Sequence, residues 1–163
     1  AAHPDLSDVS DISSEQVREV YTGEITNWRQ LGGEDAEIVV LDRPEGKSAK
    51  VYLRKAVLGE DLKVTAKVAT FDFEQDLADA LKVTAQAIGY LSLAEAKRLN
   101  LRILSLDGVK PTLENVRKGD YKVIRYISLV TKGEPKGAAK DFIEFALGSE
   151  GRKVILKNNY LPQ

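Results

Sequence analysis

Hydrophobic residues recur along this chain with two periods, one typical of strands and one typical of helices. The clearest strand-like run is Glu37–Leu41, a short apolar segment rich in β-branched residues. The run breaks at Pro44 and Gly46, and a helical pattern follows over Ser48–Leu58. This order predicts a buried strand, a tight glycine turn and a helix in direct succession.

Other helices are predicted from their end signals. Ser13 and Gln16 have the spacing of a capping box, and Gly23 is placed to end the helix that they open. The segment around Trp28 is too short for a long helix, and we expect Trp28 to be a packing anchor. Further helices are predicted over residues 73–83 (with Phe73, Leu77, Ala80 and Leu81 facing inward), 92–99, 112–118, 138–147 and through residues 154–156.

Four more segments have strand-like patterns. Leu62–Phe71 alternates weakly, and Leu101–Leu106 alternates up to a turn. Ala87–Leu91 is short and apolar, and its Gly89 indicates a close backbone approach. Tyr121–Thr131 is the longest; at ~3.3 Å per residue it would span more than 30 Å, enough to cross between two lobes. Strands that alternate with helices predict an α/β fold, although the order is not a regular series of βαβ units.

Composition narrows the classes of function. The chain has 163 residues, 43% of them hydrophobic and 30% charged, as in ordinary globular proteins. A net charge of −1 gives no electrostatic reason to bind nucleic acid or anionic membranes. With no cysteine and a single histidine, His3, the chain has no disulfides, thiolate metal sites or histidine-based catalysis. It also lacks methionine, so we expect a processed or excised product.

The turn after Glu37–Leu41 is the place where binding chemistry is concentrated. A helix N-terminus offers unpaired N–H groups and a positive dipole end to an anion, and Arg43 could add a bidentate fork. In the alternative interpretation, Arg43 pairs with Glu45 or Asp42 and the lysines are solvated. A nucleotide-binding P-loop is disfavoured because it needs glycine at the position of Leu41.

No set of residues supports catalysis. Asp72, Glu74, Asp76 and Asp79 form a local acidic cluster, but a spacing of two turns their side chains to different faces of a helix. A solvated surface is therefore favoured over paired carboxylates or a cation site. The serines have no histidine to activate them. The sequence predicts a protein that is not an enzyme and needs no cofactor.

Five blocks of the sequence carry a joint resemblance: Gln16–Gly33, Ala87–Ala96, Asp107–Val116, Tyr126–Pro135 and Phe142–Gly151. In content and order they resemble the phosphate-binding proteins of ABC importers. The joint match extends from about residue 4 to the end of the chain, and no single block would be specific. The resemblance implies a type 2 periplasmic-binding fold, in which two α/β lobes close on a ligand.

The resemblance also implies a division of this chain. Residues 1–120 would form the second lobe, nearly complete, and residues 121–163 would be the segment that returns to the first lobe. The family's N-terminal half-lobe has no counterpart here. We therefore expect exposed apolar surface on the return segment. It would be accommodated by association with another chain, such as a second copy, by a rearranged packing, or in a natural compact variant.

The resemblance assigns the ligand site to the turn already singled out. Arg43 matches the family's arginine and Gly46 the first glycine of its glycine-serine-glycine-threonine turn, whereas Lys47, Ser48 and Ala49 depart from it. A bound dianion would rely on Arg43, Lys47, Ser48 and the backbone N–H groups of residues 47–49. The loss of neutral donors would weaken binding.

The function implied is that of a solute-binding module for phosphate or a similar tetrahedral oxyanion. Its partners would be the membrane subunits of an ABC importer, and its location periplasmic or extracellular. The alternative is a sensory or protein-interaction module that kept the fold and lost tight anion binding.

Overall fold

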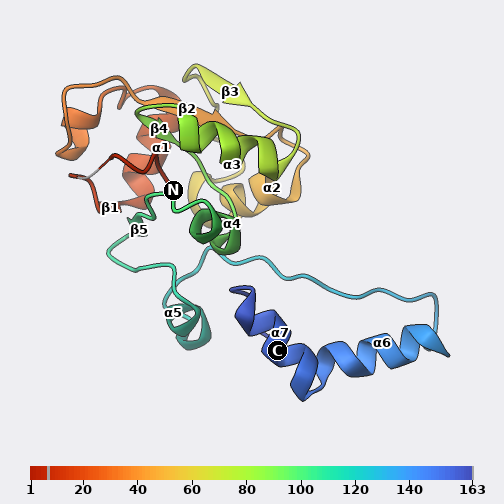
Figure 1. The fold of residues 1–163 in the computed structure, drawn as a ribbon. Helices are drawn as coiled ribbons and strands as arrows, with labels where there is room; N and C mark the ends of the chain where they lie inside the picture. Colours follow the sequence, from red (N-terminus) through yellow and green to blue (C-terminus); the bar gives the residue numbers. More distant parts are fainter. Residues whose placement is uncertain (7, 163) are drawn as a thin grey trace. The chain divides into compact units, whose positions relative to one another are not determined.

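The computed structural model describes residues 1–6 and 8–162. The chain divides into two compact units, Ala1–Ile124 and Arg125–Gln163. The first unit contains all the strands found in the described residues and the predicted anion-binding turn. The second contains two helices and the segment that leads to them (Figure 1).

The first unit is built on parallel strands. β2 (Val39–Asp42) lies between β3 (Val68–Thr70) and β4 (Ala87–Ile88) in one sheet. β1 (Asp11–Ile12) pairs with β5 (Ser105–Leu106) in a second, two-stranded sheet. Parallel strands need crossover connections, and helices occupy those connections here. The predicted α/β fold is confirmed.

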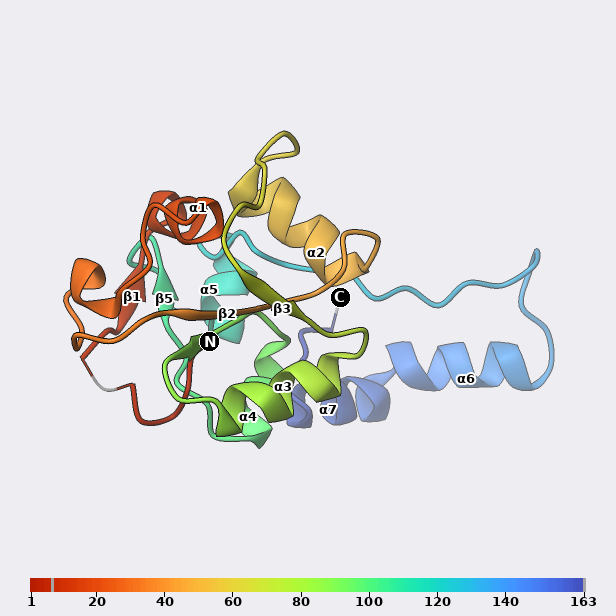
Figure 2. The same ribbon diagram turned by 90° about the horizontal axis from the view of Figure 1, so that it is seen from above.

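Helices cover both faces of the three-stranded sheet. Figure 2 shows α1 and α2 on one side of β2, and α3 and α4 on the other. The bounds of the helices in this unit are α1 Ser14–Thr22, η1 Trp28–Leu31, α2 Ser48–Leu53, η2 Arg54–Leu58, α3 Glu74–Val83, α4 Leu93–Arg98 and α5 Leu113–Lys118. Because η2 is a π-helical continuation of α2, the predicted helix over residues 48–58 is present with a wider last part.

The residues of β2 divide between two hydrophobic cores. Val40 packs in the core formed with Val20, Tyr21 and Leu53. Leu41 packs in a second core, formed with residues of α3 and with Leu99 and Leu101, which follow α4. Successive side chains of a strand point to opposite faces, so this central strand is buried on both sides. This is the reason that its sequence is a continuous apolar run.

Local signals located the first helix correctly. The Ser13 hydroxyl accepts a hydrogen bond from the Gln16 N–H, and the Gln16 side chain accepts one from the Ser13 N–H, so both bonds of the capping box form. Gly23 ends α1 at a φ of 80°, in the left-handed region that glycine adopts at little cost. Trp28 has no exposed surface, and its indole N–H donates to the carbonyl of Gln86 at 2.9 Å. It is the packing anchor that was predicted.

Three strands are shorter than predicted: β3, β5 and β4, which is limited to Ala87–Ile88 of the predicted 87–91. Of the segment 62–71, only Val68–Thr70 pairs as a strand; the N–H groups of Thr65 and Ala66 donate instead to Tyr21 of α1. Of the segment 101–106, only Ser105–Leu106 joins a ladder of more than one residue. Gly89 has the predicted close approach, since a Cβ there would lie 3.0 Å from the carbonyl oxygen of Leu41.

The second unit contains α6 (Ala138–Leu147) and α7 (Ser149–Lys157), both as predicted. The predicted long strand over residues 121–131 is wrong: no part of this segment is a strand. Among the described residues no strand lies alongside it to complete its hydrogen bonds. From Tyr126 to Val130 its apolar side chains are exposed, with Val130 at 90%.

The side chains of α3 match the predicted pattern only in part. Phe73, which was expected to face inward, is 68% exposed at the N-terminus of α3, whereas Leu77 and Leu81 are buried as expected.

Across residues 1–6 and 8–162 there is no helix whose length and apolar content would let it span a lipid bilayer.

Candidate functional site

The predicted strand, turn and helix meet as the sequence indicated. β2 ends at Asp42, and the Lys47 N–H donates to the carbonyl of Pro44 at 3.0 Å, which closes the turn. Lys47 is the residue before the first turn of α2, and its extended backbone makes Ser48 the first helical residue. The turn thus lies at the carboxyl end of the central strand, where ligands bind in open parallel sheets.

Hydrogen bonds hold both the backbone and the side chain of Arg43, the first residue after β2. Its backbone N–H donates to Oδ1 of Asp42 at 2.7 Å, and its Nη2 donates to the carbonyl of Asp72 at 2.8 Å. Its Nε is buried and has no hydrogen-bond partner among the described residues. Within that same part of the chain, its guanidinium forms no ion pair with Asp42 or Glu45. The alternative interpretation is therefore wrong for Arg43.

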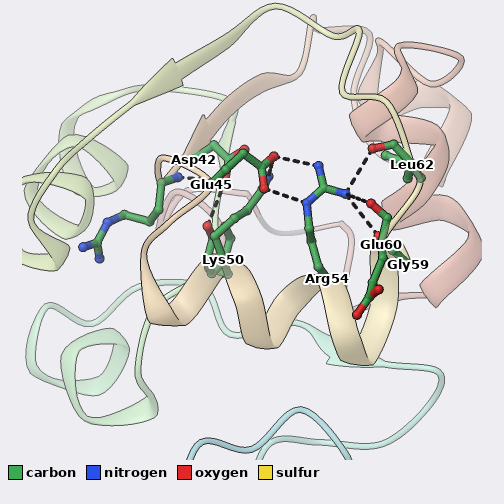
Figure 3. A network of polar contacts seen from close by, with 9 residues as sticks. Asp42, Glu45, Lys50, Arg54, Gly59, Glu60 and Leu62 are labelled. Carbon is green, nitrogen blue, oxygen red and sulfur yellow. Dashed lines mark hydrogen bonds and ion pairs between the residues drawn. The ribbon is translucent and has the colours of Figure 1, made fainter.

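Glu45 is paired with a residue that the sequence did not single out. Its two carboxylate oxygens accept from Nε and Nη2 of Arg54, each at 2.6 Å (Figure 3). Nη1 of Arg54 donates to the carbonyls of Gly59, Glu60 and Leu62 at 3.1, 3.3 and 3.0 Å. The hydrogen bonds from Arg54 hold the pKa of the Glu45 carboxyl below its usual value.

Lys47 lies between a carboxylate and an aromatic ring. Its Nζ is 2.9 Å from Oδ1 of Asp72 and 5.9 Å from the centre of the Phe73 ring. Asp72 belongs to the acidic cluster noted in the sequence, and Glu74 of the same cluster accepts from the Ser92 N–H at 2.6 Å. Since Asp72 and Glu74 have separate partners, these two do not form a carboxylate pair. No group of three or more metal-ligating side chains occurs in the described residues.

The other predicted site residues are Gly46, Ser48 and Ala49, which have small side chains or none. Gly46 is outside the left-handed region, and a Cβ there would meet no described atom within 4 Å. Ser48 is exposed and Ala49 is half-buried in the first turn of α2. The N–H groups of this first turn have no acceptor within the helix itself. Of the three N–H groups predicted to bind the anion, that of Lys47 is bonded to the carbonyl of Pro44 instead.

Lys50 is the functional-site neighbour that sequence reasoning missed. Its side chain is 1% exposed, and its Nζ lies 2.5 Å from Oδ2 of Asp42 and 4.6 Å from the centre of the Tyr21 ring. The expectation of solvated lysines is wrong here. Lys50, Leu53 and Val57 are spaced as one helix face, and both apolar members are buried. That spacing was the available signal.

The Asp42 carboxylate is the centre of a buried polar network. Besides Lys50 and the Arg43 N–H, it accepts a hydrogen bond from the Tyr90 hydroxyl at 2.8 Å. Burial, followed by the charge of Asp42, raises the pKa of Tyr90 and that of Tyr21 well above the usual value. Both tyrosines are therefore neutral donors at physiological pH, and the carboxylate charge is balanced by Lys50.

Comparisons with known proteins show which family this chain resembles. A model of the PBP superfamily domain matches residues 1–150. The phosphate-binding protein PstS of Bacillus subtilis (strain 168) is 33% identical over 163 residues, which cover 99% of this chain and 53% of that protein. A structure from Clostridium perfringens with bound phosphate, described as a phosphate ABC transporter substrate-binding protein, superposes with a TM-score of 0.86 at 30% identity, covering 99% of this chain and 66% of that one.

A third comparison gives the same picture. The crystal structure of PstS from Borrelia burgdorferi has a TM-score of 0.72 at 25% identity, with 99% of this chain and 66% of that chain covered. This chain spans about half the length of the B. subtilis relative. The resemblance stated from the sequence and the periplasmic-binding fold that it implied are confirmed. The match to the family model extends over most of the chain, which therefore belongs to the PBP superfamily.

Proposed function

We propose that this chain binds phosphate or a similar tetrahedral oxyanion, without catalysis, for an ABC importer. Support comes from relatives described as phosphate-binding proteins, and from the solved C. perfringens structure with bound phosphate. Its partners would then be the importer's membrane subunits, and its location periplasmic or extracellular. The chain spans about half the length of its B. subtilis relative. The role is therefore proposed for a complete two-lobed protein, with this chain as its second lobe and return segment.

The observation that carries the proposal is the state of Arg43. Among the described residues, Asp42, Glu45 and Asp72 are each paired with a cation: Lys50, Arg54 and Lys47 in turn. The Nε of Arg43 is buried without a partner at the start of the same turn. A buried N–H donor without an acceptor is costly, and an oxyanion would satisfy it with a charge-assisted bond.

The bound anion would be held by few groups. We place it against Arg43, Gly46, Ser48 and Ala49, with Lys47 available once its contact with Asp72 is exchanged for the ligand. The first turn of a helix favours negative charge through its dipole. The threonine hydroxyl that the family pattern supplies is replaced at Ala49, so the affinity should be lower than for a complete set of donors.

We further propose the division of the chain that the resemblance implied. Residues 1–120 would be the second lobe of a two-lobed protein, and residues 121–163 the segment that belongs with its first lobe. The exposed apolar side chains of the second unit, such as Ile127 and Phe142, support a further contact there, with another part of a longer protein or with a second copy.

Titration calorimetry with phosphate, sulfate and arsenate tests the binding proposal. We expect measurable heat with at least one of these anions. Arg43→Ala should weaken that binding by roughly tenfold or more, as expected for the loss of a charge-assisted pair. Lys82→Ala is the matched control, because Lys82 is an exposed cation at the end of α3 and outside the turn.

Two results would overturn the proposal. One is the absence of heat and of any thermal shift with all three anions at millimolar concentration. The other is an Arg43→Ala variant that binds as tightly as the control variant. Either result would favour the sensory or interaction module as the function of this fold.

A further inference from the structure

A carboxylate lies within the turn that is proposed to receive an anion. Glu45 is two residues from Arg43, one residue from Gly46, and 58% exposed at its side chain. An unbalanced negative charge there would repel an anionic ligand, and it would also compete for the Arg43 guanidinium. Anion binding therefore requires that the Glu45 charge be balanced by another cation and kept away from Arg43.

Arg54 is placed to balance the Glu45 charge. It engages both oxygens of Glu45 in a fork, with Nε and Nη2 each 2.6 Å from a carboxylate oxygen. The third nitrogen, Nη1, is held by carbonyl oxygens of Gly59, Glu60 and Leu62, just past the end of η2. Figure 3 shows the guanidinium between these two groups of acceptors. The position of Arg54 is thus fixed by backbone atoms that are independent of Glu45.

We propose that Arg54 is a positioning residue for anion binding: by capturing Glu45, it keeps the Arg43 guanidinium available for the ligand. This inference rests on the proposed function and adds to it a residue that acts on the ligand site through Glu45. Its structural basis is the contrast between two arginines near one carboxylate. Arg54 takes the carboxylate, whereas the Nε of Arg43 is buried without a partner among the described residues.

The rest of the turn is consistent with this division of roles. Nη2 of Arg43 is directed to the Asp72 carbonyl at 2.8 Å, on the neighbouring strand's continuation, and so away from an ion pair with Glu45. Arg54 is only 17% exposed at its side chain, which limits the competition of water for the pair. The lowered pKa of Glu45 has the same cause, since the hydrogen bonds from Arg54 favour its charged form.

A set of variants isolates this role. Arg54→Gln should weaken phosphate binding by roughly three- to tenfold, which is the effect of one unbalanced charge several ångströms from an anion in a hydrated site. Glu45→Gln should bind phosphate at least as tightly as the unmodified chain. The double variant Glu45→Gln/Arg54→Gln should recover most of the affinity lost in Arg54→Gln, because the competing charge is gone. Arg54→Lys should keep an intermediate affinity.

Recovery in the double variant separates positioning from a general loss of structure. If Arg54 acted only through its carbonyl contacts, removal of the Glu45 charge would restore nothing. A second readout is the NMR resonance of the Arg43 Nε–H group. It should shift in Arg54→Gln, when Glu45 is released, and return in the double variant. Thermal unfolding of each variant records whether the fold is intact.

The outcomes divide as follows. An Arg54→Gln variant that is folded and binds phosphate as tightly as the unmodified chain overturns the inference, as does a double variant as weak as Arg54→Gln. In both cases Arg43→Ala would still abolish most binding, so the proposed function would stand. If the unmodified chain binds none of the anions, the proposed function fails and the positioning role of Arg54 fails with it.

Discussion

At the scale of single residues, the buried Lys50 is the most demanding feature of the fold. An ammonium group with 1% exposure would be very unfavourable without compensation. Here the Asp42 carboxylate lies 2.5 Å away, and the Tyr21 ring lies below the charge at 4.6 Å. Asp42 in turn has the Tyr90 hydroxyl and the Arg43 N–H as donors. Every member of the network is therefore satisfied, and removal of one member should be costly.

We predict that Lys50→Met lowers the free energy of unfolding by about 3–5 kcal/mol, because it leaves the Asp42 carboxylate buried without its counter-charge. The measurement is urea denaturation followed by circular dichroism. Lys55→Met is the matched control: it makes the same change at an exposed position of the same helical stretch. The control should alter the free energy by no more than about 0.5 kcal/mol.

The double variant Asp42→Asn/Lys50→Met gives a further check on this argument. It removes both charges, so part of the lost free energy should return relative to Lys50→Met alone. A double variant that is less stable than either single variant would contradict the charge-pair explanation. It would indicate that side-chain packing, and not charge balance, dominates at this position.

At the scale of elements, α1 is joined to the end of β5 by a carboxylate that lies 93 positions further along the chain. Asp107 follows β5, and its Oδ1 accepts from the Ser14 N–H at 2.7 Å while its Oδ2 accepts from the Ser14 hydroxyl at 2.5 Å. The negative charge thus lies at the positive end of the α1 dipole. These hydrogen bonds hold the pKa of Asp107 below its usual value.

This contact predicts a pH dependence of stability. A lowered pKa in the folded state means that the ionised carboxylate favours folding. The contribution is fully present above the pKa of the unfolded chain, about 4, and is lost as the pH falls through the lower pKa of the folded state. Asp107→Asn should therefore be less stable than the unmodified chain at neutral pH, and the difference should shrink below about pH 4.

Denaturant titrations at a series of pH values measure this difference. Asparagine is the appropriate replacement because Asp107 has a φ of 52°, in the left-handed region that asparagine also tolerates. The backbone cost of the substitution is thus small. A difference between the two proteins that is constant from neutral to acidic pH would contradict a role of the Asp107 charge.

At the scale of the whole molecule, the second unit contains a strand-like segment that joins no sheet of the described residues. Residues 125–131 carry apolar side chains at Tyr126, Ile127, Leu129 and Val130, each more than half exposed. Their sequence is that of a strand, yet no strand of the described residues pairs with them. A strand needs an adjacent strand to satisfy its backbone groups, so this segment cannot form one by itself.

We predict rapid hydrogen exchange for the backbone amides of residues 126–130 in the isolated chain at low concentration. Exchange should be orders of magnitude slower in β2, which pairs with strands on both sides. NMR or mass-spectrometric exchange measures both in one sample. Protection at residues 126–130 as strong as that of Val40 would contradict the prediction and show that the segment is already paired.

The sequence by itself determined the features that depend on local contacts. The capping box at Ser13, the glycine that ends α1 and the apolar face of α3 are fixed by residues within a few positions of one another. The starts of α4 and α5 followed from such signals too, because Ser92 and Thr112 cap them as predicted. The succession of β2, turn and α2 was also local, and so the place of the candidate site was predictable.

The tertiary structure alone decided which groups of that site are engaged. Glu45 joined Arg54 rather than Arg43, and Lys50 turned inward to Asp42, because the helix brings residues eight and nine positions apart in sequence within bonding distance of the turn. Strand formation was decided in the same way, since a strand exists only where another backbone lies beside it. Residues 121–131 have the sequence of a strand and no such neighbour, and they are therefore not one.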